Sequence, residues 1–229
     1  MRKDWRRLVR RQRWVGHDLR NPLQATTTTL YLAKELLGSG RTEGRNEALQ
    51  LLQELDDQVY YMDKIVSDLQ DYARPVDAEL IETNVGKLVD RTVSIVKVPA
   101  NVRVSLNLQE PLSSVMVSPF MLKRVLTNLV TNAIQAMPKG GKLTIAASEM
   151  QDSVTISVSD NGEGIPKENL VKLFNPFFTT KAKGQGLGLA VCKRLIEAQG
   201  GSITVTSEEG KGSTFTIKVP TTRTAGTTT

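Results

Sequence analysis

The sequence has few of the residues needed for a disulfide framework, a cysteine metal site or a membrane span. Its 229 residues include one cysteine, Cys192, and one histidine, His17. A single cysteine excludes an internal disulfide and any metal site that needs several thiolates. There is no run of about 18 apolar residues, and the Arg-rich start lacks the apolar core of a secretory signal. We therefore expect a cytoplasmic protein, or the soluble part of a longer or membrane-associated one.

Positive charge is concentrated at one end of the chain. The formal net charge is +6, and residues 1–14 hold seven basic residues against one acidic residue, which accounts for all of it. Because the rest of the chain is neutral overall, no basic face is expected and nucleic-acid binding is disfavoured. Apolar residues in this opening recur at helical spacing, which predicts a basic helical extension over residues 1–14.

Two helical patterns follow, separated by the turn Gly38-Ser39-Gly40. The first runs from Val15 to about Leu37, and the second, with stricter heptad spacing, from near Gly44 to Ala73. Residues 15–74 are therefore predicted to form an antiparallel hairpin with more apolar surface than one partner helix covers. A homodimeric four-helix bundle would cover the remainder. A simple coiled-coil dimerisation module fits these heptads equally well.

The only histidine lies in the first pattern, within Gly16-His17-Asp18-Leu19-Arg20-Asn21-Pro22. On a helix, His17 and Asn21 share a face. Asp18 can accept a hydrogen bond from Nδ1 and leave Nε2 free to attack an electrophile. These three residues are the candidate catalytic group, although the stretch alone is more typical of a surface histidine in a polar turn.

Beyond Arg74-Pro75, which ends the second helix, residues 75–80 are expected to be a linker. Residues 81–220 mix helical and strand patterns, and the Thr-rich residues 221–229 are expected to be a disordered tail. Asn84 and Ser118 are predicted to cap helices that end near Lys97 and Met137. Strands are predicted at 102–108, 142–148, 154–159, 202–207 and 213–219. The expected fold is α+β with two domains: the hairpin, then an α/β sandwich whose mixed sheet is covered by helices on one face.

The predicted helix after Ser118 carries two amides, Asn128 and Asn132, four residues apart beside its buried stripe. Amides in that place bring no benefit unless a polar group docks on them. An amide oxygen suits a hard, partly hydrated Mg²⁺ that also holds phosphate oxygens.

Glycine blocks follow this helix. Asp160-Asn161-Gly162-Glu163-Gly164 offers a carboxylate acceptor beside backbone that a planar ring such as adenine could approach. Residues 174–181 form an apolar plug that ends in hydroxyls and Lys181. Gly184-Gln185-Gly186-Leu187-Gly188 opens a helix whose free N–H groups can cradle phosphates. Alone, this loop is weak evidence, and it is neither a Walker loop nor a Rossmann fingerprint.

In this order the blocks resemble those of sensor histidine kinases, over about residues 10–220. Residues 17–22 resemble the phosphoacceptor box, 128–133 the asparagine box, 160–164 and 184–189 the glycine boxes, and 174–181 the phenylalanine box. The resemblance implies an ATP-dependent protein-histidine kinase that phosphorylates His17 and passes the group to an aspartate of a response-regulator receiver domain. In such families an acid after the histidine and an Asn or Thr three residues further on also serve phosphatase action, here Asp18 and Asn21.

The resemblance also implies roles in the second domain. Asn132 would help hold Mg²⁺, Asp160 would bind the adenine amino group with support from Thr214, and Lys181 would absorb phosphoryl charge. Gln135 stands where many relatives carry a basic residue, so phosphate contacts there are expected to differ. The remaining candidate nucleotide-binding residues are Asn128, Gly162, Gly164, Gly184, Gly186, Leu187 and Gly188.

Two other interpretations are weaker. An ATPase of the Hsp90, gyrase and MutL superfamily would share the asparagine helix and glycine blocks, but it needs a catalytic carboxylate near Asn128. Residues 121–128 contain no acid. A degenerate dimeric scaffold that does not use ATP would have no need for intact asparagine and glycine blocks.

Overall fold

The computed structural model describes residues 2–38, 42–73, 75–181, 184 and 186–221, with backbone only for residues 2–19, 42 and 43. The chain divides into two compact units, Met1–Asp71 and Tyr72–Thr229. Each unit is described by itself.

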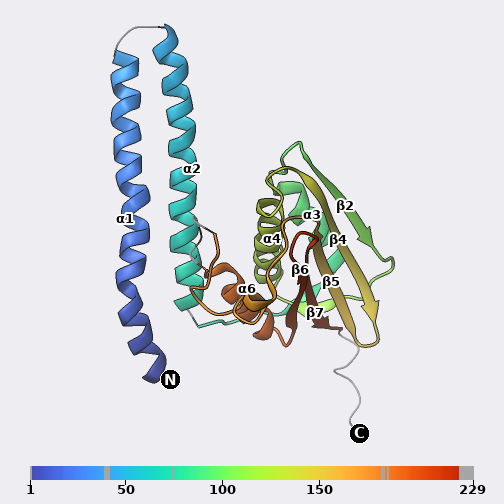
Figure 1. Cartoon of the computed structure of the whole chain (residues 1–229). Coiled ribbons are helices and arrows are strands. Elements are labelled where there is room, and N and C mark those ends of the chain that lie inside the picture. The colour runs from blue at the N-terminus through green and yellow to red at the C-terminus, as the bar shows by residue number, and fades with distance from the viewer. Residues whose placement is uncertain (1, 39–41, 74, 182–183, 185, 222–229) are drawn as a thin grey trace. The chain divides into compact units, whose positions relative to one another are not determined.

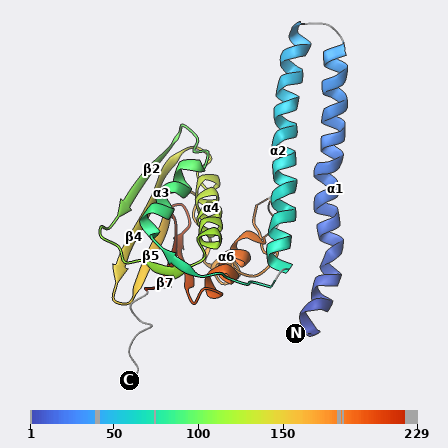
Figure 2. The same ribbon diagram turned by 180° about the vertical axis from the view of Figure 1, so that it is seen from behind.

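The first unit is a hairpin of two long helices, α1 (Arg2–Gly38) and α2 (Thr42–Ala73), which lie side by side in both ribbon views (Figures 1 and 2). The basic residues 1–14, expected as an extension, are part of α1 rather than a separate element, and α1 continues through Pro22. Thr26 donates a 2.9 Å hydrogen bond to Gln58 across the hairpin. The side chains buried between the helices are Thr29, Ala33, Ala48, Leu55 and Ile65.

The second unit is built on a five-stranded sheet in the order β2-β4-β5-β7-β6. The strands are β2 (Val102–Leu108), β4 (Gly141–Met150), β5 (Ser153–Asp160), β6 (Ser202–Glu208) and β7 (Gly212–Pro220). Strands β2 and β4 are parallel and the other pairs are antiparallel, so the sheet is mixed, as predicted.

Three helices cover one face of this sheet (Figure 1): α3 (Val85–Ile95), α4 (Pro119–Gln135) and α6 (Gly188–Glu197). Alternate residues of β4 and β5 point into the core beneath them, and the other residues face outward. The buried side of α4 is the one that its apolar spacing predicts. It consists of Leu122, Val125, Leu126, Leu129, Val130 and Ala133.

Three short elements were not predicted. Strands β1 (Ile81–Thr83) and β3 (Val115–Val117) pair antiparallel, and α5 (Lys167–Leu170) is a single turn. Three or four residues are too few for a period to emerge from the sequence. Thr221, expected in a disordered tail, is buried and forms a bridge with Val115. The rest of that predicted tail lies outside the described residues.

The two predicted helix caps differ. The side chain of Asn84 accepts a 2.9 Å hydrogen bond from the backbone N–H of Lys87, as expected of a cap. Ser118 is the N-cap residue of α4 and Pro119 opens the helix, as predicted, but the predicted capping bond of the Ser118 hydroxyl to any described residue is absent. Its backbone N–H instead donates to Oε1 of the buried Gln199 at 2.7 Å, which ties the start of α4 to the end of α6.

Among the described residues, no helix combines the length and the apolar character that crossing a membrane requires.

Candidate functional site

The site is built on the polar face of α4, where Asn128 and Asn132 lie one turn apart. Asn132 Nδ2 approaches Asn128 Oδ1 at 3.5 Å, the outer limit of a hydrogen bond. Asn128 Nδ2 donates to the sulfur of the buried Cys192 on α6 at 3.1 Å. The Asn128 amide is therefore held between two helices, with its oxygen directed along α4 toward Asn132.

Lys181 brings a positive charge to the same face. Its ammonium group donates to Asn132 Oδ1 at 3.0 Å and to Gln135 Oε1 at 2.7 Å. Its backbone N–H donates to the hydroxyl of Thr179 at 3.1 Å, which closes a local turn. The amides of Asn128, Asn132 and Gln135 on α4 and the Lys181 ammonium on the loop form one polar cluster.

The start of α6 lies against this cluster because Gly188 has no side chain. A Cβ at Gly188 would come within 2.7 Å of Asn128 Nδ2 and 3.0 Å of its Oδ1. Helix α6 can therefore begin directly beside the asparagine amides. The free N–H groups of its first turn and its dipole provide a binding place for an anion such as phosphate.

The glycine loop before α6 is joined to the apolar plug. Gly186 adopts φ +65°, a conformation that favours glycine. Its carbonyl oxygen accepts a 2.8 Å hydrogen bond from the N–H of Phe177. A Cβ at Gly184 would meet the Thr179 hydroxyl at 2.7 Å. The plug and the loop that leads into α6 thus pack together.

Asp160 lies at the end of β5 with 9% of its surface exposed. Burial raises the pKa of this carboxyl group above its usual range. Backbone N–H groups of Gly162 and Ser213 and the positive charge of Lys181 oppose that rise, the first through a 2.9 Å hydrogen bond to Oδ1. The carboxyl is held in place as a hydrogen-bond acceptor.

The turn after Asp160 is fixed to the other end of α4. Glu163 donates its N–H to the carbonyl of Ala136 at 3.0 Å, and a Cβ at Gly162 would lie 2.2 Å from the same oxygen. Gly164 packs in the same way against the carbonyl of Glu208. Helix α4 therefore carries the amide cluster along its length and the Asp160 turn at its C-terminal end.

Thr214 does not take the place that the resemblance implied. Asp160 lies opposite Ser213 in the register of β5 and β7, whereas Thr214 lies opposite Ser159. Because side chains alternate along a strand, the Thr214 hydroxyl is on the other face, where it hydrogen-bonds to the Ser159 hydroxyl at 2.9 Å. The support for Asp160 comes from the Ser213 backbone.

The other predicted residues differ in how far they are described. Asn21 is exposed on α1, whereas the side chains of His17 and Asp18 lie outside the described residues. Leu187 is only 1% exposed, so it can offer a ligand little more than its backbone. Cys192 was not predicted to take part. Cys192 lies four residues after Gly188 and so on the same face of the helix, and this spacing could have indicated that it faces the site.

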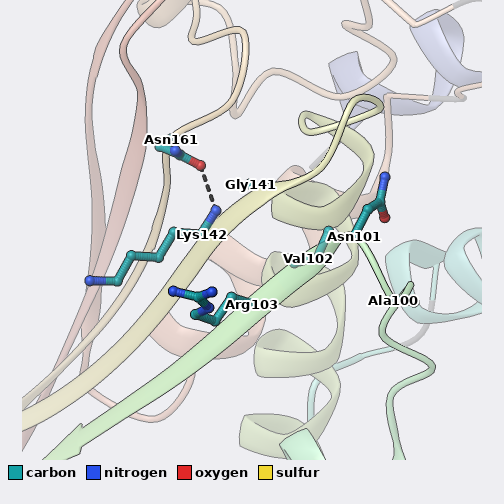
Figure 3. A pocket seen from close by; sticks show the side chains of 7 residues that line it. All are labelled: Ala100, Asn101, Val102, Arg103, Gly141, Lys142 and Asn161. Carbon is teal, nitrogen blue, oxygen red and sulfur yellow. Dashed lines mark hydrogen bonds between the residues drawn. The ribbon is translucent and has the colours of Figure 1, made fainter.

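A separate hollow of about 540 Å³ lies where β2 and β4 begin (Figure 3). Arg103 and Lys142 line it as neighbours in the parallel register, and Asn161 Oδ1 accepts a 2.6 Å hydrogen bond from the Lys142 N–H. None of the predicted nucleotide-binding residues lines this hollow.

The residues of the site fit a magnesium nucleotide better than a protein-bound metal. Among the described residues, no three His, Cys, Asp or Glu side chains gather as a metal site. Asn132 Oδ1 is a neutral oxygen donor of the kind Mg²⁺ accepts when phosphates supply the other ligands. Because Gly162 and Gly188 have no side chain, the two glycine segments lie directly against α4, at Ala136 and at Asn128.

The family described as histidine kinase-, DNA gyrase B-, and HSP90-like ATPase matches residues 118–223. The sensor histidine kinase ZraS of Escherichia coli (strain K12) is 37% identical over 209 residues, which are 90% of this chain and 44% of ZraS. The chain therefore spans less than half the length of this relative. The match includes the helical hairpin, which the ATPase family alone does not.

Solved structures agree with these sequence matches. The nucleotide-free catalytic domain of histidine kinase ThkA is 35% identical, with a TM-score of 0.56 over 62% of this chain and 96% of that one. Histidine kinase ThkA in complex with response regulator protein TrrA is 28% identical, with a TM-score of 0.74 over 98% of this chain and 66% of that one.

Proposed function

The chain belongs to the sensor histidine kinases, and we propose that it phosphorylates His17 from ATP and passes the phosphoryl group to an aspartate of a response regulator. The observation that carries this proposal is the cluster of Asn128, Asn132 and Lys181 beside the start of α6. It combines amide oxygens, the positive charge of Lys181 and a helix N-terminus, as a magnesium triphosphate requires.

Each end of the nucleotide has a counterpart in the site. The Asp160 carboxylate would accept a hydrogen bond from the adenine amino group. The first-turn N–H groups of α6 and the Lys181 ammonium would bind phosphate oxygens, and Asn132 Oδ1 would be the protein ligand of Mg²⁺. The metal would neutralise charge on the transferred phosphoryl group.

The reaction itself would occur on His17. Nε2 attacks the γ-phosphorus in line, the bond from that phosphorus to the β–γ bridging oxygen breaks, and ADP leaves with the electron pair. The imidazole becomes cationic as the N–P bond forms. Asp18 then accepts the Nδ1 proton, which leaves a neutral phosphohistidine.

The second step would transfer this phosphoryl group to a receiver domain. The complex of ThkA with the response regulator TrrA supports a partner of this class. Asn21, exposed on α1 four residues after His17, would orient a water molecule for removal of the phosphoryl group from the regulator. The same hairpin face would then serve both directions of signalling.

We also propose that the hairpin forms a homodimeric four-helix bundle. Apolar side chains at seven-residue intervals remain exposed on each helix, from 39% to 57% of their surface. A second hairpin would remove this surface from water. These side chains are Leu23, Leu30 and Leu37 on α1, and Leu52, Val59 and Val66 on α2.

The decisive experiment incubates the purified chain with γ-labelled ATP and Mg²⁺ beside the His17→Gln and Asn132→Asp variants. We expect label on the wild type alone, stable in alkali and lost in acid, as a phosphoramidate is. ATP hydrolysis without any labelled protein would instead favour an ATPase. Absence of ATP binding would favour a scaffold.

A further inference from the structure

We propose that Gln135 is the positioning residue for Lys181, and that it holds the positive charge of this lysine over the phosphate-binding cluster. This inference rests on the proposed function, because it assigns a role within the same nucleotide site.

Of the two hydrogen bonds described for the Lys181 ammonium, the one to Gln135 is the shorter. The ammonium lies 2.7 Å from Gln135 Oε1 and 3.0 Å from Asn132 Oδ1. The two amides are three residues apart on α4, so they lie on one face and receive the ammonium together. Gln135 is exposed and contributes no side chain to the core, so its amide is available for this contact.

The hydrogen bond to Gln135 matters because Asn132 has another task. Its Oδ1 is the oxygen proposed to bind Mg²⁺, and a metal ion there would compete with the lysine for the same oxygen. Gln135 gives the ammonium a place to stay one turn further along the helix. Lys181 can then remain at the site while Asn132 turns to the metal.

An uncharged residue is the best choice at this position. A carboxylate would hold Lys181 but would also cancel the charge that phosphate needs. A second cation would repel it, by about 1 kcal/mol at 4 Å in water. The amide orients the lysine and leaves its charge in place, which makes glutamine and lysine at positions 135 and 181 one functional pair.

The test compares Gln135→Leu, Lys181→Gln and the exchange Gln135→Lys with Lys181→Gln in the full chain. Titration calorimetry measures affinity for a nonhydrolysable ATP analogue with Mg²⁺ and, separately, for adenosine. Lys218→Gln, on the exposed face of β7, is the matched loss of one positive charge.

We expect Gln135→Leu to weaken triphosphate binding about three- to tenfold, a modest effect because the pair is exposed, and to leave adenosine binding unchanged. Lys181→Gln should weaken it further, and the exchange should recover most of the loss because it restores one cation and one amide. Lys218→Gln should resemble the wild type.

Wild-type triphosphate affinity in Gln135→Leu would overturn the inference, and so would an equal loss of adenosine affinity, which indicates general damage to the site. Failure of the exchange to improve on Lys181→Gln would also overturn it. If the wild type bound neither nucleotide nor nucleoside, the proposed function would fail first and this inference with it.

Discussion

Asp160 is the residue whose chemistry is most constrained by its surroundings. It is nearly buried, its pKa is raised mainly by that burial, and two backbone N–H groups hold it. Burial of this acceptor lowers the folding stability when the carboxyl is ionised. The loss of stability can be measured because it depends on pH.

We predict that Asp160→Asn abolishes detectable nucleotide binding and changes the pH dependence of folding stability, because burial raises the pKa of the Asp160 carboxyl. A raised pKa means that the folded state holds the proton more tightly than the unfolded state. The carboxyl's contribution to stability is therefore most favourable in acid and declines as pH rises from its usual pKa through the folded-state value. The asparagine variant lacks this decline.

Thermal unfolding should be measured from about pH 3.5 to about pH 8, a range that begins near the usual aspartate pKa. The stability of Asp160→Asn should rise relative to that of the wild type as pH rises, and the difference should then stay constant. Asp90→Asn, at an exposed position on α3, is the control and should run parallel to the wild type. A variant that loses stability relative to the wild type as pH rises would contradict this account.

Gly188 allows a second prediction. An alanine there would place a methyl group 2.7 Å from Asn128 Nδ2, so the amide must move or α6 must shift. We expect affinity for the ATP analogue to fall at least about tenfold and stability to fall by about 1–3 kcal/mol. Gly86→Ala in α3, where an added Cβ would have Asn84 Oδ1 at an ordinary 3.5 Å, should be neutral or slightly stabilising.

At the scale of elements, the predicted caps offer a direct comparison. Asn84→Ala should cost about 1 kcal/mol because a side-chain bond to Lys87 is lost. Ser118→Ala should cost clearly less, because the link there runs through the backbone N–H to Gln199. Chemical denaturation of each variant measures both. An equal cost at the two sites would mean that the Ser118 hydroxyl caps α4 in solution.

The elements recovered from sequence were those with a sustained period. The buried face of α4 and the strand at 102–108 were predicted because apolar residues repeat over many positions. Ser118 was a suitable cap by type, but the start of α4 is held through its backbone N–H by Gln199, which is 81 residues away and could not be paired with it from the sequence. The prediction that Thr214 supports Asp160 was wrong, because a difference of one residue along a strand places the side chain on the other face of the sheet.

The exposed heptads of the hairpin give an element-scale prediction about assembly. Leu30→Glu with Val59→Glu introduces charge into both apolar stripes, and we expect the protein to change from dimer to monomer in sedimentation at micromolar concentration. Gln50→Glu adds one charge at an exposed polar position of α2 and should remain a dimer. A wild type that sediments as a monomer would contradict the proposed bundle.

At the scale of the whole molecule, the chain separates a hairpin that carries His17 from a unit that carries the proposed nucleotide site. The order of the motifs was sufficient to identify the family, because five blocks in sequence constrain it more than any single one. Contacts between distant segments, such as Asn128 with Cys192 and Lys181 with Gln135, were not predicted, because they depend on how α4, α6 and the plug pack.

Helix α4 meets the glycine start of α6 at Asn128 and the Asp160 turn at Ala136. These positions are eight residues apart, or about 12 Å along a rigid helix. In the proposed nucleotide site, the distance between the phosphate end and the base end would therefore be set by the single helix α4. Insertion of one residue between Asn128 and Ala136 would lengthen this segment of α4 and rotate the two positions relative to each other by about 100°.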